Sequence, residues 1–259
     1  MLSEKISQFA AEGISCFSFI ELEQRISSSP TALKSALRRL LKKGEIAMPY
    51  QGFYVIVPPE YRSLGCRPAE QFIPDLMNYL GEYYYVGLLS AAEYHGAAHH
   101  RPQVFQVMVA KPRRTIISGK VQVNFIVRGN IEAIPTQPRN TVTGILKLST
   151  PEATVFDLAG YYRHCGWLDN VATVLSEMVE VIDPEKLVTV AELSPITWVQ
   201  RLGYLLETVG SEEIWQPLAG YVNAKNPVRS PLLPSARIKG AKFNKRWQIY
   251  VNTKVESEI

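Results

Sequence analysis

The sequence predicts an α+β fold in which a small N-terminal module precedes a larger mixed α/β domain with a small sheet and several helices. Three observations predict it. Helical periodicity alternates with turn signals through residues 1–60, stretches of β-forming residues lie between 104 and 149, and amphipathic helical patterns dominate thereafter. Because 46% of the 259 residues are hydrophobic and 20% are charged, the chain can build a core and does not have the composition of a disordered protein.

Two short helices open the chain. The first helix is indicated by apolar residues at helical spacing, namely Leu2, Ile6, Phe9 and Ala10. Gly13 is expected to end it. After a short apolar stretch, Ser18 and Glu21 have the S-x-x-E spacing of a capping box, in which each side chain accepts a hydrogen bond from the other residue's backbone N–H. We therefore expect a second helix over residues 19–26.

A third helix is expected over residues 30–43. Pro30 suits its first position because proline has no N–H to leave unsatisfied there, and Gly44 suits its C-terminal end. One face is apolar and carries Leu33, Ala36, Leu37, Leu40 and Leu41. The other face has no acidic residue and carries Lys34, Arg38, Arg39, Lys42 and Lys43.

Residues 46–57 contain two stretches of β-formers around a turn with Pro49 and Gly52, which predicts a hairpin. Three helices and a hairpin, with a short turn between the second and third helices, are the layout of a winged helix-turn-helix. In that module the third helix enters the major groove of double-stranded DNA.

The predicted DNA contacts follow from this layout. Residues near the start of the third helix lie closest to the base edges, and these are Thr31, Lys34, Ser35 and Arg38. Phosphate contacts are expected from Arg39, Lys42 and Lys43, and wing-tip contacts to the adjacent backbone or minor groove from Tyr50 and Gln51. The alternative is a solvated face or a protein-binding module, because the helix dipole favours cations near a helix C-terminus whatever the function.

The rest of the chain is expected to form the second domain. We place a DNA-binding domain at residues 1–60, a linker at 61–69 and the large domain at 70–259. Helices are expected over 69–80 and 86–96, and then three strands at 104–111, 121–127 and 143–149. The first two strands are expected to form a hairpin, with Lys111, Arg113 and Arg114 at its base.

Helices follow at 151–162, 168–182 and 196–210, with the Glu residues of the last two expected to face solvent, and the tail is expected to end in a strand around residues 247–251. Charge is segregated along this part of the chain. Residues 101–147 hold eight basic residues and one acidic residue. Residues 150–224 hold three basic and eleven acidic residues, and residues 225–254 hold eight basic residues and no acidic one. The basic segments either pack on the acidic one or face an anionic partner.

Several function classes lack support. Cys16, Cys66 and Cys165 have no C-x-x-C spacing, which argues against a disulfide framework or zinc knuckle and fits a cytoplasmic protein. No stretch is long and apolar enough for a membrane span, and the start lacks the apolar core of a secretory signal. No catalytic motif is present, so we expect neither an enzyme nor a cofactor.

A histidine cluster leaves one enzymatic alternative. The segment EYHGAAHH holds Glu93, His95, His99 and His100, a set that could serve a metal-dependent nucleic-acid-processing enzyme if the side chains converged. Gly96 interrupts the helix that would stack His95 over His99, so we favour a polar helix end and expect no metal. Alanine substitution of these histidines would abolish metal-dependent turnover if the alternative were right.

Ordered motifs across residues 1–255 resemble the AbiEi antitoxins of type IV toxin–antitoxin systems, which act in abortive infection, a phage-defence response. They are YYYVGLLSAAEYHGAAHHRPQVFQVMVAKPRR, LKLSTPEATVFDLAGY, GWLDNVATVLSEM, VQRLGYLLE and RWQIYVN. The resemblance implies a repressor that binds repeats in its own promoter, with the DNA-binding helix at Pro30 to Lys43. It also implies that the C-terminal domain counteracts a nucleotidyltransferase toxin without forming a stable complex.

A speculative antitoxin surface is the basic set Lys111, Arg113, Arg114, Lys239, Lys242, Lys245 and Arg246, which could compete for the toxin's nucleotide or nucleic-acid substrate. These residues could equally only offset the acidic helices. A winged-helix regulator of genes unrelated to a toxin is the other functional alternative, and a nucleotidyltransferase gene immediately downstream would distinguish the two.

Overall fold

The computed structural model describes residues 2–97 and 102–256, and every structural statement below concerns these residues. The chain forms two compact units. Unit 1 comprises Met1–Tyr85, Gln103–Ile131 and Pro138–Lys147, and unit 2 comprises Val86–Pro102, Glu132–Gln137 and Leu148–Ile259. In the described part of the chain, no helix has the length and apolar character needed to cross a bilayer.

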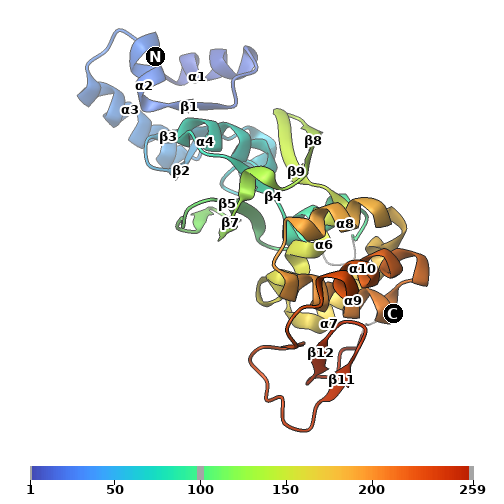
Figure 1. Ribbon diagram of the computed structural model, residues 1–259. Coiled ribbons are helices and arrows are strands. Elements are labelled where there is room, and N and C mark those ends of the chain that lie inside the picture. The colour runs from blue at the N-terminus through green and yellow to red at the C-terminus, as the bar shows by residue number, and fades with distance from the viewer. Residues whose placement is uncertain (1, 98–101, 257–259) are drawn as a thin grey trace. The chain divides into compact units, whose positions relative to one another are not determined.

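Unit 1 begins with a winged helix-turn-helix arrangement (Figure 1). Its helices are α1 (Leu2–Ala11), α2 (Phe19–Arg25) and α3 (Pro30–Lys43), and its strands are β1 (Cys16–Ser18), β2 (Ile46–Tyr50) and β3 (Phe53–Ile56). The strands form an antiparallel sheet in the order β1-β3-β2. The three expected helices and the wing hairpin are therefore present.

Local sequence explains where these helices begin and end. Glu21 N–H donates to Ser18 Oγ at 3.1 Å and Ser18 N–H donates to Glu21 Oε2 at 2.6 Å, which confirms the capping box. Ser29 caps α3 by accepting a hydrogen bond from Ala32 N–H, and Gly44 ends α3 with a left-handed φ of 68°. The segment that carries the cations is thus a helix with both ends fixed.

A small core holds α3 against the other helices and the wing. It contains Ile6, Phe9, Phe17, Leu22, Leu33, Leu37, Leu40, Ile46, Tyr54 and Ile56. Leu33, Leu37 and Leu40 supply the α3 face of this core, while Ala36 and Leu41 of the same predicted stripe are half-buried. Burial of the apolar face leaves the polar face of α3 outward.

Unit 1 continues into a larger sheet. Its further elements are the 3-10 turns η1 (Pro59–Tyr61) and η2 (Ala69–Gln71), helix α4 (Ile73–Leu80), and strands β4 (Tyr84–Val86), β5 (Phe105–Val109), β6 (Ile116–Ser118), β7 (Val121–Val127), β8 (Thr136–Thr141) and β9 (Gly144–Ser149). The sheet order is β6-β7-β5-β4-β9-β8. Strands β4, β8 and β9 each have part of their residues in unit 2.

The expected hairpin between residues 104–111 and 121–127 is wrong. β5 and β7 are parallel neighbours, with Val107 opposite Phe125, and the hairpin lies between β6 and β7 instead. The segment between β5 and β7 contains the short strand β6, whose β-branched residues pair with β7 across a turn at Gly119, where φ is 60°. Because β6 runs antiparallel to β7, the chain reverses direction twice between β5 and β7, and β7 runs parallel to β5.

Residues 61–69 are hydrogen-bonded into unit 1. Arg67 Nε donates to the Ile56 carbonyl at 2.8 Å, Gln71 Nε2 donates to the Tyr61 hydroxyl at 2.9 Å, and Lys120 N–H donates to the Leu64 carbonyl at 2.7 Å. The end of the wing is therefore attached to the segment that follows it. The division into compact units falls after Tyr85 rather than within this segment.

Unit 2 is mainly helical. Its helices are α5 (Leu88–Tyr94), α6 (Pro151–Gly160), α7 (Trp167–Met178), α8 (Pro184–Glu192), α9 (Ile196–Val209) and α10 (Glu212–Lys225), with 3-10 turns at η4 (Ile131–Ala133, which begins in unit 1), η5 (Tyr162–Cys165) and η6 (Val179–Val181). Helices α8 and α10 were not expected from the sequence. α10 contains Pro217 in its interior, a residue that usually ends a helix.

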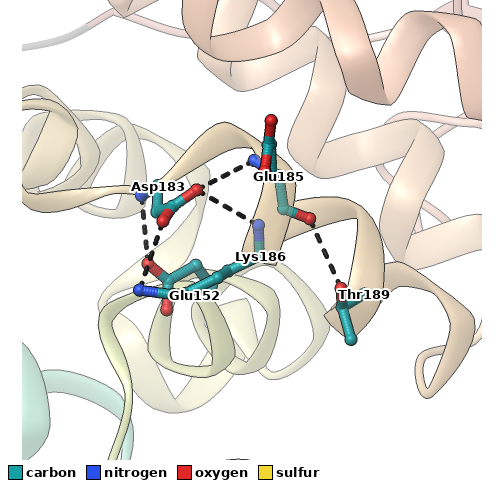
Figure 2. A network of polar contacts seen from close by, with 5 residues as sticks. All are labelled: Glu152, Asp183, Glu185, Lys186 and Thr189. Atoms are coloured by element: carbon teal, nitrogen blue, oxygen red, sulfur yellow. Dashed lines mark hydrogen bonds and ion pairs between the residues drawn. The ribbon is translucent and has the colours of Figure 1, made fainter.

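Glu152, in the first turn of α6, is buried. Its side chain is 3% exposed, and its Oε1 accepts a hydrogen bond from the Asp183 backbone N–H at 3.0 Å (Figure 2). Asp183 in turn caps α8 by accepting from Glu185 N–H and Lys186 N–H. Glu152 therefore connects α6 to the start of α8, a role that its sequence spacing does not reveal.

Unit 2 ends in a three-stranded sheet in the order β10-β12-β11. The strands are β10 (Ser230–Pro231), β11 (Lys242–Asn244) and β12 (Ile249–Val251), so the expected terminal strand is present but begins after Trp247. Gln200 of α9 joins the sheet to the helices, because its Nε2 donates to the Gln248 carbonyl at 3.0 Å and its Oε1 accepts from Ser230 Oγ at 3.0 Å.

Candidate nucleic-acid interface

The exposed face of α3 gathers the helix residues predicted to contact DNA. Leu33, Leu37 and Leu40 are buried, and all the predicted contact residues of the helix are exposed, namely Thr31, Lys34, Ser35, Arg38, Arg39, Lys42 and Lys43. α3 contains no acidic residue to neutralise these cations. The structure therefore brings the seven predicted helix residues together on one polar face with five positive charges.

The cations differ in how they are held. Lys34 Nζ lies 5.5 Å from the centre of the Phe19 ring, a cation–π distance that orients this side chain toward α2. Arg38 and Lys42 lie one turn apart on the outward face, and neither has an ion pair in the described part of the chain. Arg38 and Lys42 are thus positioned to meet an external anion.

Arg39 and Lys43 lie on the side of α3 that faces α1. Together with Leu2, Ala36 and Leu40 they line a hollow of about 310 Å³. Lys43 Nζ is 3.7 Å from Glu45 Oε1, and Glu45 Oε2 also accepts a hydrogen bond from Ser3 Oγ at 3.0 Å. Lys43 is therefore partly neutralised within the module.

The two predicted wing residues lie beside α4 and the segment 112–116 of unit 1. The rings of Tyr50 and Tyr79 pack edge to face with their centres 6.5 Å apart, and the side chain of Tyr50 remains partly exposed. Tyr50 and Gln51 line a cavity of about 500 Å³ that also includes Arg113 and Arg114. The structure thus joins wing residues to two arginines that the sequence assigned to a different surface.

Arg113 is committed to an ion pair in this cavity. Its Nη2 lies 2.6 Å from Glu82 Oε1, and its Nε donates to Glu82 Oε2 at 2.8 Å, which is a bidentate arrangement. The hydrogen bond from Arg113 lowers the pKa of Glu82, and the same bond raises the pKa of Arg113. Of the two arginines that line the cavity, Arg114 is the exposed one and faces solvent.

The speculative antitoxin residues fall in both units. Lys111, Arg113 and Arg114 belong to unit 1, whereas Lys239, Lys242, Lys245 and Arg246 belong to unit 2. Arg246 forms an ion pair with Glu207, and its guanidinium lies 4.4 Å from the centre of a ring of Trp215. Lys239 and Lys242 line a separate cavity in unit 2. Two further cations, Arg237 and Lys254, line the same cavity.

The histidine cluster is only partly described. His95 Nε2 is 2.8 Å from the Ser149 carbonyl oxygen, to which it donates, so this nitrogen is engaged inside unit 2. His99 and His100 lie outside the described residues. Glu93 and the described His95 form no metal-binding group with other described side chains.

Comparisons with known proteins match both parts of the chain. Residues 4–57 match the family model described as a transcriptional regulator, AbiEi antitoxin, and residues 85–208 match the model of the AbiEi antitoxin C-terminal domain. No curated protein matches the chain. The first matched segment contains all of α2 and α3, including the cationic face.

Among solved structures, the RV2827C protein from Mycobacterium tuberculosis has the same fold. It superimposes with a TM-score of 0.63 at 17% sequence identity, over 94% of this chain and 88% of that one. An antigenic nucleotidyltransferase-like protein from Paracoccidioides brasiliensis aligns with a TM-score of 0.37 at 10% identity, over 57% of this chain and 95% of that one, which is too low to indicate a shared fold.

The two family models follow one another in the order expected for a regulator with a C-terminal antitoxin domain, and together they span most of the chain. The chain belongs to the AbiEi family of antitoxin transcriptional regulators.

Proposed function

We propose that this protein represses its own promoter by binding double-stranded DNA through α3, and that it counteracts a nucleotidyltransferase toxin. Residues 1–60 serve as the DNA-binding domain, residues 61–69 as the connection and residues 70–259 as the antitoxin domain. The protein is not an enzyme in this proposal and acts in the cytoplasm. The observation that carries the DNA-binding part is the acid-free cationic face of α3, turned outward by its own apolar face.

The charges on α3 suit the DNA backbone. Each phosphate that a Lys or Arg neutralises releases a counterion, so binding weakens as salt rises. The amide groups at the start of α3 add a favourable site for a phosphate, because a helix N-terminus carries partial positive charge.

The DNA-binding proposal is tested by titrating the full chain onto a duplex of its own promoter at several salt concentrations. The double variant Lys34→Ala with Arg38→Ala removes two cations from the outward face. We expect at least a tenfold loss of affinity for the promoter duplex, because a good contact to a base edge is worth about 1–3 kcal/mol.

A matched control removes two exposed cations elsewhere in unit 1. Lys5→Ala with Arg62→Ala changes the net charge equally but leaves α3 intact. We expect this control to keep affinity within about twofold. Equal losses for the two double variants would mean that the whole positive charge of the unit, rather than α3, drives binding.

The antitoxin part rests on membership in the family and is tested separately. The full chain is expressed from an unrelated promoter together with a nucleotidyltransferase encoded beside it, under conditions where the toxin alone stops growth. We expect growth to be restored by the wild-type chain and equally by the Lys34→Ala, Arg38→Ala variant. Failure of both to restore growth would reject the antitoxin function and leave the DNA-binding result untouched.

A further inference from the structure

Unit 2 contains a second basic site, independent of α3. A cavity of about 610 Å³ lies between Tyr204 of α9, the loop 237–242 and the chain end 251–255. Four of its lining residues are cations, namely Arg237, Lys239, Lys242 and Lys254, and none of its lining residues is acidic. The sequence does not predict this cavity, because Tyr204 lies more than thirty residues before Arg237, the first of these cations.

Three of the four cations have no ionic partner among the described residues. Lys254 pairs with Glu256. Arg237, Lys239 and Lys242 form no ion pair with any residue that the structure describes, and all three are exposed. Like charges gathered around one cavity repel one another, and a bound anion would relieve that repulsion.

The backbone that carries these cations is fixed by specific hydrogen bonds. Asn252 holds the start of the loop, because its Oδ1 accepts from Leu233 N–H at 2.9 Å and its Nδ2 donates to the Leu233 carbonyl at 2.8 Å and the Ala236 carbonyl at 3.0 Å. At the other end, Ala241 N–H donates to the Ile238 carbonyl at 2.9 Å, and Lys242 pairs with Val251 in the sheet.

This arrangement differs from a solvated run of charges. The cations approach one cavity from a loop, a strand and the chain end, which are held together by the Asn252 hydrogen bonds and the pairing of β11 with β12. Tyr204 adds an aromatic side chain to the same cavity. Several cations with fixed spacing suit a ligand that carries several adjacent negative charges, and a neighbouring aromatic ring suits a base attached to them.

We propose that this cavity binds the phosphate groups of a nucleotide or of a single-stranded nucleic acid. Arg237, Lys239 and Lys242 contact the phosphates, and Tyr204 contacts the base or sugar. The proposal does not depend on DNA recognition by α3, since α3 belongs to the other unit. It also stands whether or not the protein counteracts a toxin.

Binding is tested with the full chain in the Lys34→Ala, Arg38→Ala background, so that α3 contributes little. Three probes are titrated by calorimetry at low salt: ATP, inorganic tripolyphosphate and a twelve-nucleotide oligothymidylate. Saturable binding of ATP with a stoichiometry of one per chain identifies a nucleotide as the source of the phosphates. Saturable binding of the oligonucleotide with weaker binding of ATP identifies a nucleic acid instead.

Two double variants locate the site. Lys239→Gln with Lys242→Gln removes two cavity cations, and we expect affinity for the bound probe to fall at least tenfold. Lys225→Gln with Lys245→Gln removes two exposed cations of the same basic tail that do not line the cavity, and we expect a change below twofold. Circular dichroism checks that both variants keep the wild-type fold.

The role of the aromatic residue has its own readout. Tyr204→Leu keeps the charges, so it should weaken ATP binding severalfold and leave tripolyphosphate binding unchanged if the ring contacts the base. Equal weakening by the cavity and control double variants, or no saturable binding of any of the three probes at millimolar concentration, would overturn the proposal. Equal effects of Tyr204→Leu on ATP and tripolyphosphate would remove Tyr204 from the site.

Discussion

Trp247 packs directly on Gly203 of α9, and a Cβ atom added to the glycine would overlap Cζ3 of the indole ring. The indole is fully buried, and its Nε1 donates a hydrogen bond to Glu207 Oε2 one turn further along α9. The ring also meets Trp215 of α10 edge to face, with the ring centres 6.2 Å apart. These contacts attach the C-terminal sheet to the helices of unit 2.

We predict that Gly203→Ala destabilises the protein. Alanine is favoured over glycine in a helix by up to about 1 kcal/mol, but the added methyl group would overlap the buried Trp247 indole, which would have to shift. Overpacking of this kind costs about 1–3 kcal/mol, so the net effect is a loss. Urea unfolding followed by tryptophan fluorescence and circular dichroism measures it.

The control for this prediction is Gly220→Ala in α10. No atom lies within 4 Å of the position that its Cβ would take, so only the intrinsic helix preference acts. We expect Gly220→Ala to be neutral or to stabilise the protein by up to about 1 kcal/mol. A Gly203→Ala variant as stable as the Gly220→Ala variant would show that Trp247 does not pack on α9 as described.

Ser29→Ala should loosen the start of α3. Ser29 Oγ accepts a hydrogen bond from Ala32 N–H at 3.3 Å, and removal of such a cap costs about 0.5–2 kcal/mol. Hydrogen exchange of the amides in the first turn of α3 should therefore become faster. Ser28→Ala is the matched control, because Ser28 is equally exposed and its side chain forms no cap. Equal exchange in both variants would contradict the capping role of Ser29.

The Glu82–Arg113 ion pair predicts a pH dependence of stability. The hydrogen bond from Arg113 lowers the pKa of Glu82 below its ordinary value of 4.5, so the folded protein binds this proton less readily than the unfolded chain does. The stabilisation is present above pH 4.5 and is lost as the pH falls through the lowered folded-state pKa. The pair is the more effective because the two side chains are only 21% and 17% exposed.

The measurement compares the free energy of unfolding of the wild type and of Glu82→Gln between pH 3 and pH 7. We expect the wild type to exceed the variant by more at pH 7 than at pH 3. Glu23→Gln removes the same charge from an exposed position on α2 that has no ion pair in the described part of the chain, and should show no such trend. A difference that is independent of pH would mean that the Glu82–Arg113 pair does not form.

The N-terminal module could be predicted from sequence because its determinants are local. The Ser18–Glu21 spacing, Pro30 and Gly44 each act within a few residues of their position, and they set the helix ends that the structure shows. The position of α3 follows from the same short-range signals. The cationic face could therefore be assigned before any long-range contact was known.

Long-range pairing explains what could not be predicted. The parallel β5–β7 pair depends on β6, a strand of three residues whose partner choice leaves little trace in sequence periodicity. The placement of Tyr50 beside Arg113 and of Tyr204 beside Lys242 joins residues more than thirty positions apart. Such cavities are set by long-range packing. The sequence therefore shows which residues are charged but not which of them line the same cavity.

The last prediction separates the residues of α3 that read sequence from those that hold the backbone. Arg38 and Lys42 are both exposed, lie one turn apart and have no ion pair in the described part of the chain, so they form a matched pair. Arg38 lies closer to the N-terminal end of α3, which approaches the base edges in this type of module. Lys42 lies in the last turn, where contact with a phosphate is expected.

Arg38→Ala should therefore lower affinity for the promoter site by about 1–3 kcal/mol more than for an unrelated duplex, whereas Lys42→Ala should weaken both equally and make the salt slope shallower by about 0.9. Lys43→Ala should have a smaller effect than Lys42→Ala, because Glu45 already partly neutralises Lys43. Binding to the two duplexes across a salt series measures all three variants. If Lys42→Ala changed the preference between duplexes and Arg38→Ala did not, α3 would enter the groove by its opposite end.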